Sequence, residues 1–407
     1  LVTWFLLAAL NMAMVVNNPL PFYATCVGIG HGHAQVPGSK LCLRGGNGKV
    51  IPATESCRQA EILKEEAWSL YNDGEVTEAE RKLQAALRLD PQSIDICSKL
   101  AMIYEFDVQD LGKAEEIYLR TMSIKPNDST YVYDYAAFLQ ERKRDYDGAE
   151  TYYKRAIEMN PADGDALNNY AVFLQDVRNA SDASEEVFRR AVAARPDRAS
   201  NLCNYAQFLE RVRRDPLKAE ELYKKAVEVQ PTDACGLYNY AVFLEEFRRD
   251  HAGAAAMYQR VIAQDPQDAD ALNNYALLKQ HIDGDAEGAK CLLEKAVEVD
   301  PDDADIVSNL GTVLESLGRH TQAERYYRRA LELAPDDVAL RANVATFLRD
   351  KLGLAEEGSA LLESARKMDP ATVEAVLKAQ DLEPGASRRL SRPGQRSPLL
   401  PWAPPPQ

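Results

Sequence analysis

Apolar side chains recur with a helical spacing through most of the chain, and the pattern is interrupted at regular intervals. In residues 302–335 the first apolar stripe has steps of three and four residues: Ile306, Leu310, Val313, Leu314 and Leu317. This spacing is that of one face of an amphipathic helix, predicted over residues 305–317. Gly318 interrupts it, and a second helix is predicted over about 320–333, ending before Pro335.

The same helix pair returns with a fixed period that is marked by proline. Successive prolines lie 35 residues apart at positions 91, 126, 161, 196, 231, 266 and 301, and two more follow at 335 and 370. About nine units therefore run over residues 57–370. Aspartates after the prolines, such as Asp302 and Asp303, are suited to cap the next first helix.

Small and aromatic residues occupy fixed places in these units. The first helix carries one small residue in the series Ala171, Ala206, Ala241, Ala276 and Gly311. The second helix carries another in the series Ala149, Ala219, Ala254, Ala289 and Ala323. The same helix carries an aromatic series at Tyr153, Phe188, Tyr223, Tyr258 and Tyr327. Small residues allow two helix backbones to approach closely, so both series are interpreted as packing contacts and the rings as core.

This pattern resembles the tetratricopeptide repeat, most closely in residues 302–335. The resemblance implies an all-α fold, a right-handed α-solenoid of about nine stacked helix-turn-helix repeats over 57–370. It also implies that the first helices line a concave groove for peptides and protein segments. Most units depart from the family by one extra residue in the turn, within charged runs such as 142–145, 213–215 and 248–250. These runs form either a basic ridge or solvated turns that satisfy helix ends.

One position in the first helix is expected to face the groove. After Glu65, Lys99 and Asp134 it holds six asparagines in succession: Asn169, Asn204, Asn239, Asn274, Asn309 and Asn343. A side-chain amide donates and accepts, so a row of amides can hold a peptide backbone whatever its sequence. The row resembles that of O-GlcNAc transferases and SPINDLY-type proteins. Two alternatives are inheritance by duplication and a hydrogen bond from each asparagine to the neighbouring repeat.

Further groove positions are predicted beside this row. The candidate groove residues are Tyr133, Asn168, Tyr238 and Asn273, together with Val172, Gln207, Val242 and Thr312. They give a mixed polar and apolar surface with little charge in its middle.

The ends of the chain differ from the repeats. Residues 1–16 are apolar and uncharged, and are a signal-peptide core, the remnant of a membrane anchor, or upstream sequence included by error. An irregular linker is predicted over 17–56, a capping helix over 371–383, and a disordered tail rich in Pro and Arg over 384–407. A cytoplasmic location is favoured, with membrane-tethered or secretory locations left open.

The composition gives little indication of a catalytic, cofactor or metal site. A net charge of −15 disfavours nucleic acid as a partner, and the seven cysteines include no C-x-x-C pair. We expect no catalytic residues, no cofactor and no metal site, with His31 and His33 as a weak exception. The predicted function is therefore a non-catalytic scaffold that binds an extended segment of a protein partner. The alternatives are the recognition arm of a larger enzyme, such as an O-GlcNAc-type glycosyltransferase, and the soluble domain of a membrane-anchored protein.

Overall fold

A computed structural model describes residues 42–44, 50–52 and 55–382 of the 407-residue chain. The predictions for 1–16 and 384–407 lie outside these residues. The described chain divides into two compact units, with the boundary between Phe208 and Leu209. We call these the N-terminal unit and the C-terminal unit and describe each by itself.

The N-terminal unit begins with a small antiparallel hairpin of β1 (Cys42–Arg44) and β2 (Val50–Pro52), within the segment predicted as linker. Its helices are α2 (Glu55–Asn72), α3 (Val76–Leu89), α4 (Ile94–Met102), α5 (Leu111–Ile124), α6 (Ser129–Phe138), α7 (Tyr146–Met159), α8 (Gly164–Asp176), α9 (Ser181–Ala194) and α10 (Ala199–Phe208).

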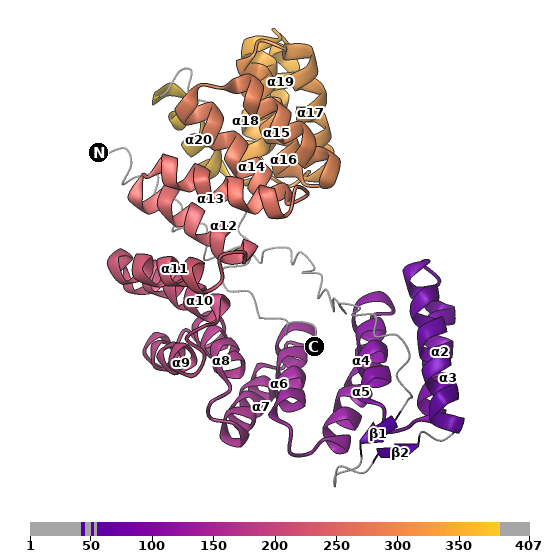
Figure 1. The fold of residues 1–407 in the computed structure, drawn as a ribbon. Helices are drawn as coiled ribbons and strands as arrows, with labels where there is room; N and C mark the ends of the chain where they lie inside the picture. Colours follow the sequence, from indigo (N-terminus) through magenta and orange to yellow (C-terminus); the bar gives the residue numbers. More distant parts are fainter. Residues whose placement is uncertain (1–41, 45–49, 53–54, 383–407) are drawn as a thin grey trace. The chain divides into compact units, whose positions relative to one another are not determined.

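The C-terminal unit contains helices α11 (Pro216–Val229), α12 (Ala234–Phe243), α13 (His251–Gln264), α14 (Ala269–Leu278), α15 (Ala286–Val299), α16 (Ala304–Ser316), α17 (His320–Leu333), α18 (Val338–Lys351), α19 (Ala355–Met368) and α20 (Pro370–Leu382). Within each unit successive helices pack as pairs (Figure 1). The prediction of an all-α array of helical repeats is confirmed. In the described part of the chain, no helix has the length and apolar character needed to cross a membrane.

Close approach of paired helices explains the small residues. A β-carbon added to Gly311 would lie 2.9 Å from the ring of Tyr327, on the second helix of the same pair. In the last pair Gly358 replaces the usual alanine, and a β-carbon there would lie 2.6 Å from the backbone oxygen of Ala345. The glycine in this ninth repeat therefore reflects a tighter helix contact.

The extra residue of most repeats is accommodated differently from the prediction. It does not lengthen the turn, because the first helix widens into one π-helical turn that absorbs the residue. These turns are η1 (Ile103–Asp107), η2 (Leu139–Lys143), η3 (Leu209–Arg213), η4 (Leu244–Arg248) and η5 (Lys279–Asp283). A residue with left-handed backbone conformation follows most of them, for example Arg144 with φ of 56° and Gly284 with φ of 67°.

Aspartates cap the helices as predicted. Asp303 Oδ1 accepts hydrogen bonds from the backbone N–H groups of Asp305 and Ile306, at 2.8 and 2.9 Å. Equivalent aspartates precede other first helices at Asp128, Asp163, Asp233, Asp268 and Asp337. These bonds satisfy backbone donors that the helix itself leaves free, so they fix where each helix begins.

Helix α20 covers the end of the helical array. Its Val373 is fully buried in a cluster with Ala342 and Ala345 of α18 and Leu362 and Ala365 of α19. The apolar face of the last helix pair is therefore shielded from water.

Candidate functional site

The predicted asparagine row lies on the first helices and is mostly buried. Asn169 and Asn309 are each 2% exposed, and Asn274 is 1% exposed. Asn204 and Asn343 are each 5% exposed, and Asn239 is half-buried. A buried amide requires hydrogen-bond partners, so the partners of these side chains decide what the row does.

In the N-terminal unit the amides form a relay that crosses three repeats. Asn204 Nδ2 donates to Asn168 Oδ1 at 3.2 Å, and Asn168 Nδ2 donates to Asn169 Oδ1 at 3.1 Å. Asn169 Nδ2 then donates to the hydroxyl oxygen of Tyr133. The relay connects α10, α8 and α6, which are the first helices of successive repeats.

The C-terminal unit repeats this arrangement. Asn309 Nδ2 donates to Asn273 Oδ1 at 2.9 Å, and Asn273 Nδ2 donates to Asn274 Oδ1 at 3.2 Å. Asn274 Nδ2 donates to the Tyr238 hydroxyl at 2.8 Å. The relay therefore recurs three repeats later with the same residue types.

Four of the six asparagines thus bond a neighbouring repeat, which is one of the alternatives that the sequence left open. They are Asn169, Asn204, Asn274 and Asn309. Asn239 differs, since its Nδ2 lies 3.4 Å from Cys235 Sγ within the same helix. Contact of the row with a peptide stays a prediction. The sequence did contain a signal for these inter-repeat pairs. The position one residue before the row also carries hydrogen-bonding side chains, namely Tyr133, Asn168, Tyr238 and Asn273.

A second polar row joins the two helices in five of the pairs, and the sequence analysis missed it. A tyrosine of the second helix donates to a carboxylate or amide at the end of the first. The pairs are Tyr118–Glu105 at 2.8 Å, Tyr153–Gln140 at 2.9 Å, Tyr223–Glu210 at 3.1 Å, Tyr258–Glu245 at 3.3 Å and Tyr327–Glu315 at 2.9 Å. The aromatic series, predicted only as core, therefore also hydrogen-bonds.

Burial alters the acidity of carboxyl groups beside these rows. Burial raises the pKa of Glu210 to about 7, against the opposing effects of Arg211 and the Tyr223 hydrogen bond. Burial also raises the pKa of Asp134, which precedes the asparagines in their row, to about 7, and the charges of Asp128 and Asp163 add to the shift. Burial thus favours the protonated form of both carboxyl groups.

Several buried acceptor atoms on the first helices have no hydrogen-bond partner. They are Asn201 Oδ1, Gln207 Oε1, Gln280 Oε1 and Asn309 Oδ1. Such atoms are rare because each loses its bond to water without replacement. Gln207 was among the predicted groove residues, and Asn309 belongs to the asparagine row.

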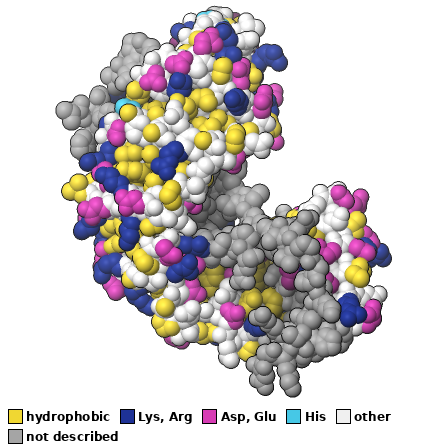
Figure 2. Space-filling model, in the orientation of Figure 1, with side chains coloured by type: hydrophobic (Ala, Val, Ile, Leu, Met, Phe, Trp, Pro, Cys, Tyr) yellow, Lys and Arg dark blue, Asp and Glu magenta, His cyan; other side chains and the backbone are white. Residues whose placement is uncertain are grey.

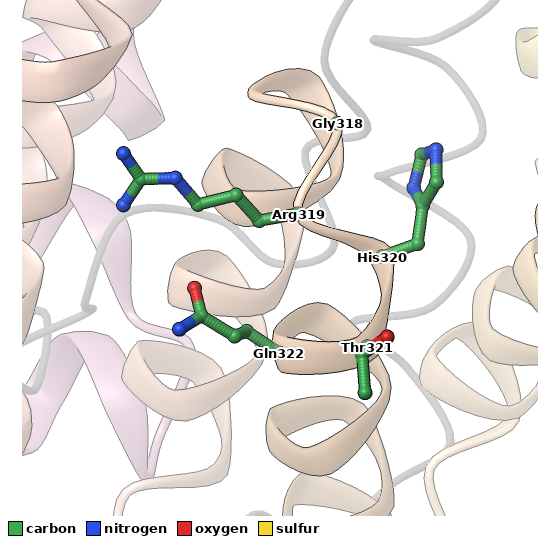
Figure 3. A pocket seen from close by; sticks show the side chains of 5 residues that line it. All are labelled: Gly318, Arg319, His320, Thr321 and Gln322. Carbon is green, nitrogen blue, oxygen red and sulfur yellow. The ribbon is translucent and has the colours of Figure 1, made fainter.

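The described residues contain no group of three or more His, Cys, Asp or Glu side chains that could hold a metal ion. A shallow hollow at the start of α17 is lined by Gly318, Arg319, His320, Thr321 and Gln322. Its side chains diverge and do not converge on one point (Figure 3).

The paired helices, small-residue contacts and repeated aromatics define an all-helical repeat protein of the tetratricopeptide type. Models of the tetratricopeptide repeat match residues 139–199, 209–269 and 277–346. These matched residues are tetratricopeptide repeats, as the resemblance implied.

Two solved structures illustrate the similarity. A chain in the crystal structure of the APC/C hetero-tetramer Cut9–Hcn1 is 14% identical, with a TM-score of 0.48. That match covers 75% of this chain and 55% of that chain, so the present chain matches about half of its relative's length. MamA is 22% identical over 39% of this chain and 91% of that chain, with a TM-score of 0.35. No curated protein sequence matches the chain.

Proposed function

We propose that this chain is a non-catalytic scaffold that binds an extended segment of a protein partner along its first helices. Tetratricopeptide repeats generally mediate protein–protein interactions, and stacked repeats offer long binding surfaces. The asparagine relay holds neighbouring repeats in register, and the residues beside it contact the segment.

The unpartnered acceptors are the observation that carries this proposal. Gln207 is 6% exposed and Gln280 is 9% exposed, and the Oε1 atom of each is buried without a partner. Asn309 uses its amide nitrogen for Asn273 and leaves its oxygen unpartnered. Within the C-terminal unit, a bound segment in extended conformation presents backbone N–H groups, which are the donors that the oxygens of Gln280 and Asn309 lack. Gln207 offers the same kind of acceptor within the N-terminal unit.

The proposal is tested by placing a photo-crosslinking amino acid in the full-length chain. One version carries it at Val242, a half-buried position of α12 that lies three residues after Asn239. A second version carries it at Lys225, which is exposed on the second helix α11. We expect crosslinks to a defined segment of a partner from Val242 and not from Lys225.

A double variant then tests whether the unpartnered acceptors contribute to binding of the segment. Gln207→Met and Gln280→Met remove both acceptors while keeping side-chain length, and we expect them to abolish the Val242 crosslink. The matched control, Gln264→Met with Gln322→Met, changes two exposed glutamines and should retain it. Equal crosslinking from both versions, or from the test and control variants, would contradict binding along the first helices.

A further inference from the structure

A buried ammonium group lies near the start of the N-terminal unit, at Lys99 of α4. Lys99 belongs to the same row as the asparagines and is only 5% exposed. Its Nζ lies 3.6 Å from the centroid of the Trp68 ring on α2. An ammonium group carries three N–H donors, yet within the described residues Lys99 makes no hydrogen bond and no ion pair. Burial lowers the pKa of Lys99, which shows that its charge is incompletely compensated.

The amide relay shows what is missing at Lys99. In the relay a residue of the row donates to the residue that precedes the row in the previous repeat, as Asn169 does to Tyr133. The corresponding place opposite Lys99 is held by Lys64, which directly precedes Glu65 of the row. A lysine side chain has no acceptor atom. The donor of the row is therefore kept at Lys99, while the side chain that should accept from it is replaced by a second donor.

The carboxylates nearest to Lys99 are engaged by Lys64. Lys64 Nζ lies 2.6 Å from Glu61 Oε1 and 2.7 Å from Asp95 Oδ2. Glu65 Oε1 lies 3.5 Å from the same nitrogen. Three carboxylates thus accompany two ammonium groups, and the surroundings of Lys99 already hold an excess of one negative charge. These acids would repel a further carboxylate, whereas they would not repel an uncharged oxygen.

The wider charge distribution gives an anion no advantage either. The chain carries a net charge of −15, and Figure 2 shows basic and acidic side chains intermixed over the visible face. A surface of this kind does not steer an anionic ligand toward one lysine. The acceptor that suits Lys99 is therefore an uncharged carbonyl oxygen.

From these observations we propose that Lys99 is a further binding residue for the extended segment, and that its ammonium group donates to a backbone carbonyl oxygen of that segment. This inference rests on the proposed function and extends it. The N-terminal unit then carries one binding group of each kind, since Gln207 offers an acceptor for a backbone N–H. The Trp68 ring holds the ammonium group in place. Every extended chain presents both backbone groups, so binding at Lys99 does not require an acidic side chain.

The test uses peptides selected from a random twelve-residue library for binding to the full-length chain, with affinities measured by fluorescence anisotropy. The test variant Lys99→Met removes the donors and keeps a flexible apolar side chain beside Trp68. The control Lys154→Met removes an exposed lysine of α7, a second helix of the same unit. In the peptides, each backbone carbonyl in turn is replaced by a thiocarbonyl, because sulfur is a weak acceptor.

We expect Lys99→Met to weaken binding by about tenfold or more, because a hydrogen bond from a charged donor is lost. Lys154→Met should bind as the wild-type chain does. A thiocarbonyl at one position should weaken binding to the wild-type chain and have no further effect on the Lys99→Met chain, which identifies the carbonyl that Lys99 contacts. Replacing acids of the peptide by amides, and amidating its C-terminus, should leave its affinity unchanged.

Equal binding by the wild-type chain and Lys99→Met would overturn the proposal. Loss of binding when the carboxylates of the peptide are removed would also overturn it, as would thiocarbonyl effects that are the same in both chains. Gln207→Met with Gln280→Met separates this failure from failure of the proposed function. Peptides that lose affinity for that double variant alone leave the proposed function standing without Lys99. Peptides that are insensitive to both changes, or a library without a binding peptide, overturn both.

Discussion

Asn168 lies at the centre of the first amide relay, where one fully buried side chain serves two partners. It accepts from Asn204 and donates to Asn169. A buried amide of this kind matters for the stability of the fold mainly because its removal leaves buried partners without hydrogen bonds. The hydrogen bonds themselves contribute less.

Replacing Asn168 with alanine should therefore destabilise the N-terminal unit. The amide nitrogen of Asn204 and the oxygen of Asn169 would lose their partners, at a cost of about 1–3 kcal/mol. Amide hydrogen exchange localised to α8 and α10 should report the change. Asn239→Ala serves as the comparison, because its half-buried amide contacts only a sulfur atom and its loss should have a much smaller effect.

Glu210 gives a pH dependence whose direction follows from its raised pKa. The folded chain retains the proton up to about pH 7, whereas the unfolded chain loses it near the ordinary value of 4.5. The folded state therefore binds more protons between these values, so its stability falls as pH rises through this window, and the full penalty applies above pH 7.

Glu210→Gln should remove this penalty while keeping the acceptor for Tyr223, as Gln140 does for Tyr153. We expect a gain in unfolding free energy of up to about 3 kcal/mol at pH 8 and little change at pH 5. Chemical denaturation at the two pH values measures it. A gain of equal size at both would show that proton binding is not the cause.

At the scale of the helices, the small-residue contact decides how closely each pair can pack. Ala241 of α12 is fully buried in the position that Gly311 occupies against Tyr327. Ala241→Leu should overpack this contact and cost about 1–3 kcal/mol. Thermal unfolding followed by circular dichroism tests this, with Ala263→Leu at an exposed position of α13 as control. Equal melting of the two variants would contradict the assigned contact.

Helix positions could be predicted from sequence, whereas side-chain partners could not. The 35-residue spacing and Gly318 placed α16 and α17 within one residue of their observed ends. The spacing did not reveal that the extra residue forms a π-helical turn, because one inserted residue fits either a turn or a helix. It also did not decide whether Asn169 bonds a peptide or Tyr133, since both choices satisfy a buried amide.

At the scale of the whole chain, a repeat array needs a closing element wherever its apolar face would otherwise meet water. Helix α20 performs this role with Val373, which contacts the cluster that includes Ala345 and Leu362. It is therefore part of the folded array although it lies beyond the last helix pair.

A chain that stops after Asp369 should lose this cover. We expect faster hydrogen exchange in α18 and α19, together with self-association visible by size-exclusion chromatography, because the exposed cluster is apolar. A chain that stops after Glu383 removes only the tail and should behave as the full-length chain does. Identical behaviour of the two truncated chains would show that α20 is dispensable.

Because the amide relay recurs after three repeats, it also determines which lengths of chain could be removed while the hydrogen bonds between neighbouring repeats are kept. Removing residues 134–238 would bring Asn274 into the position that Asn169 holds, opposite Tyr133, a tyrosine like its present partner Tyr238. Removing a single repeat, residues 204–238, would instead place Asn274 opposite Cys203. Gains and losses of length in such a chain should therefore be tolerated best in blocks of three repeats.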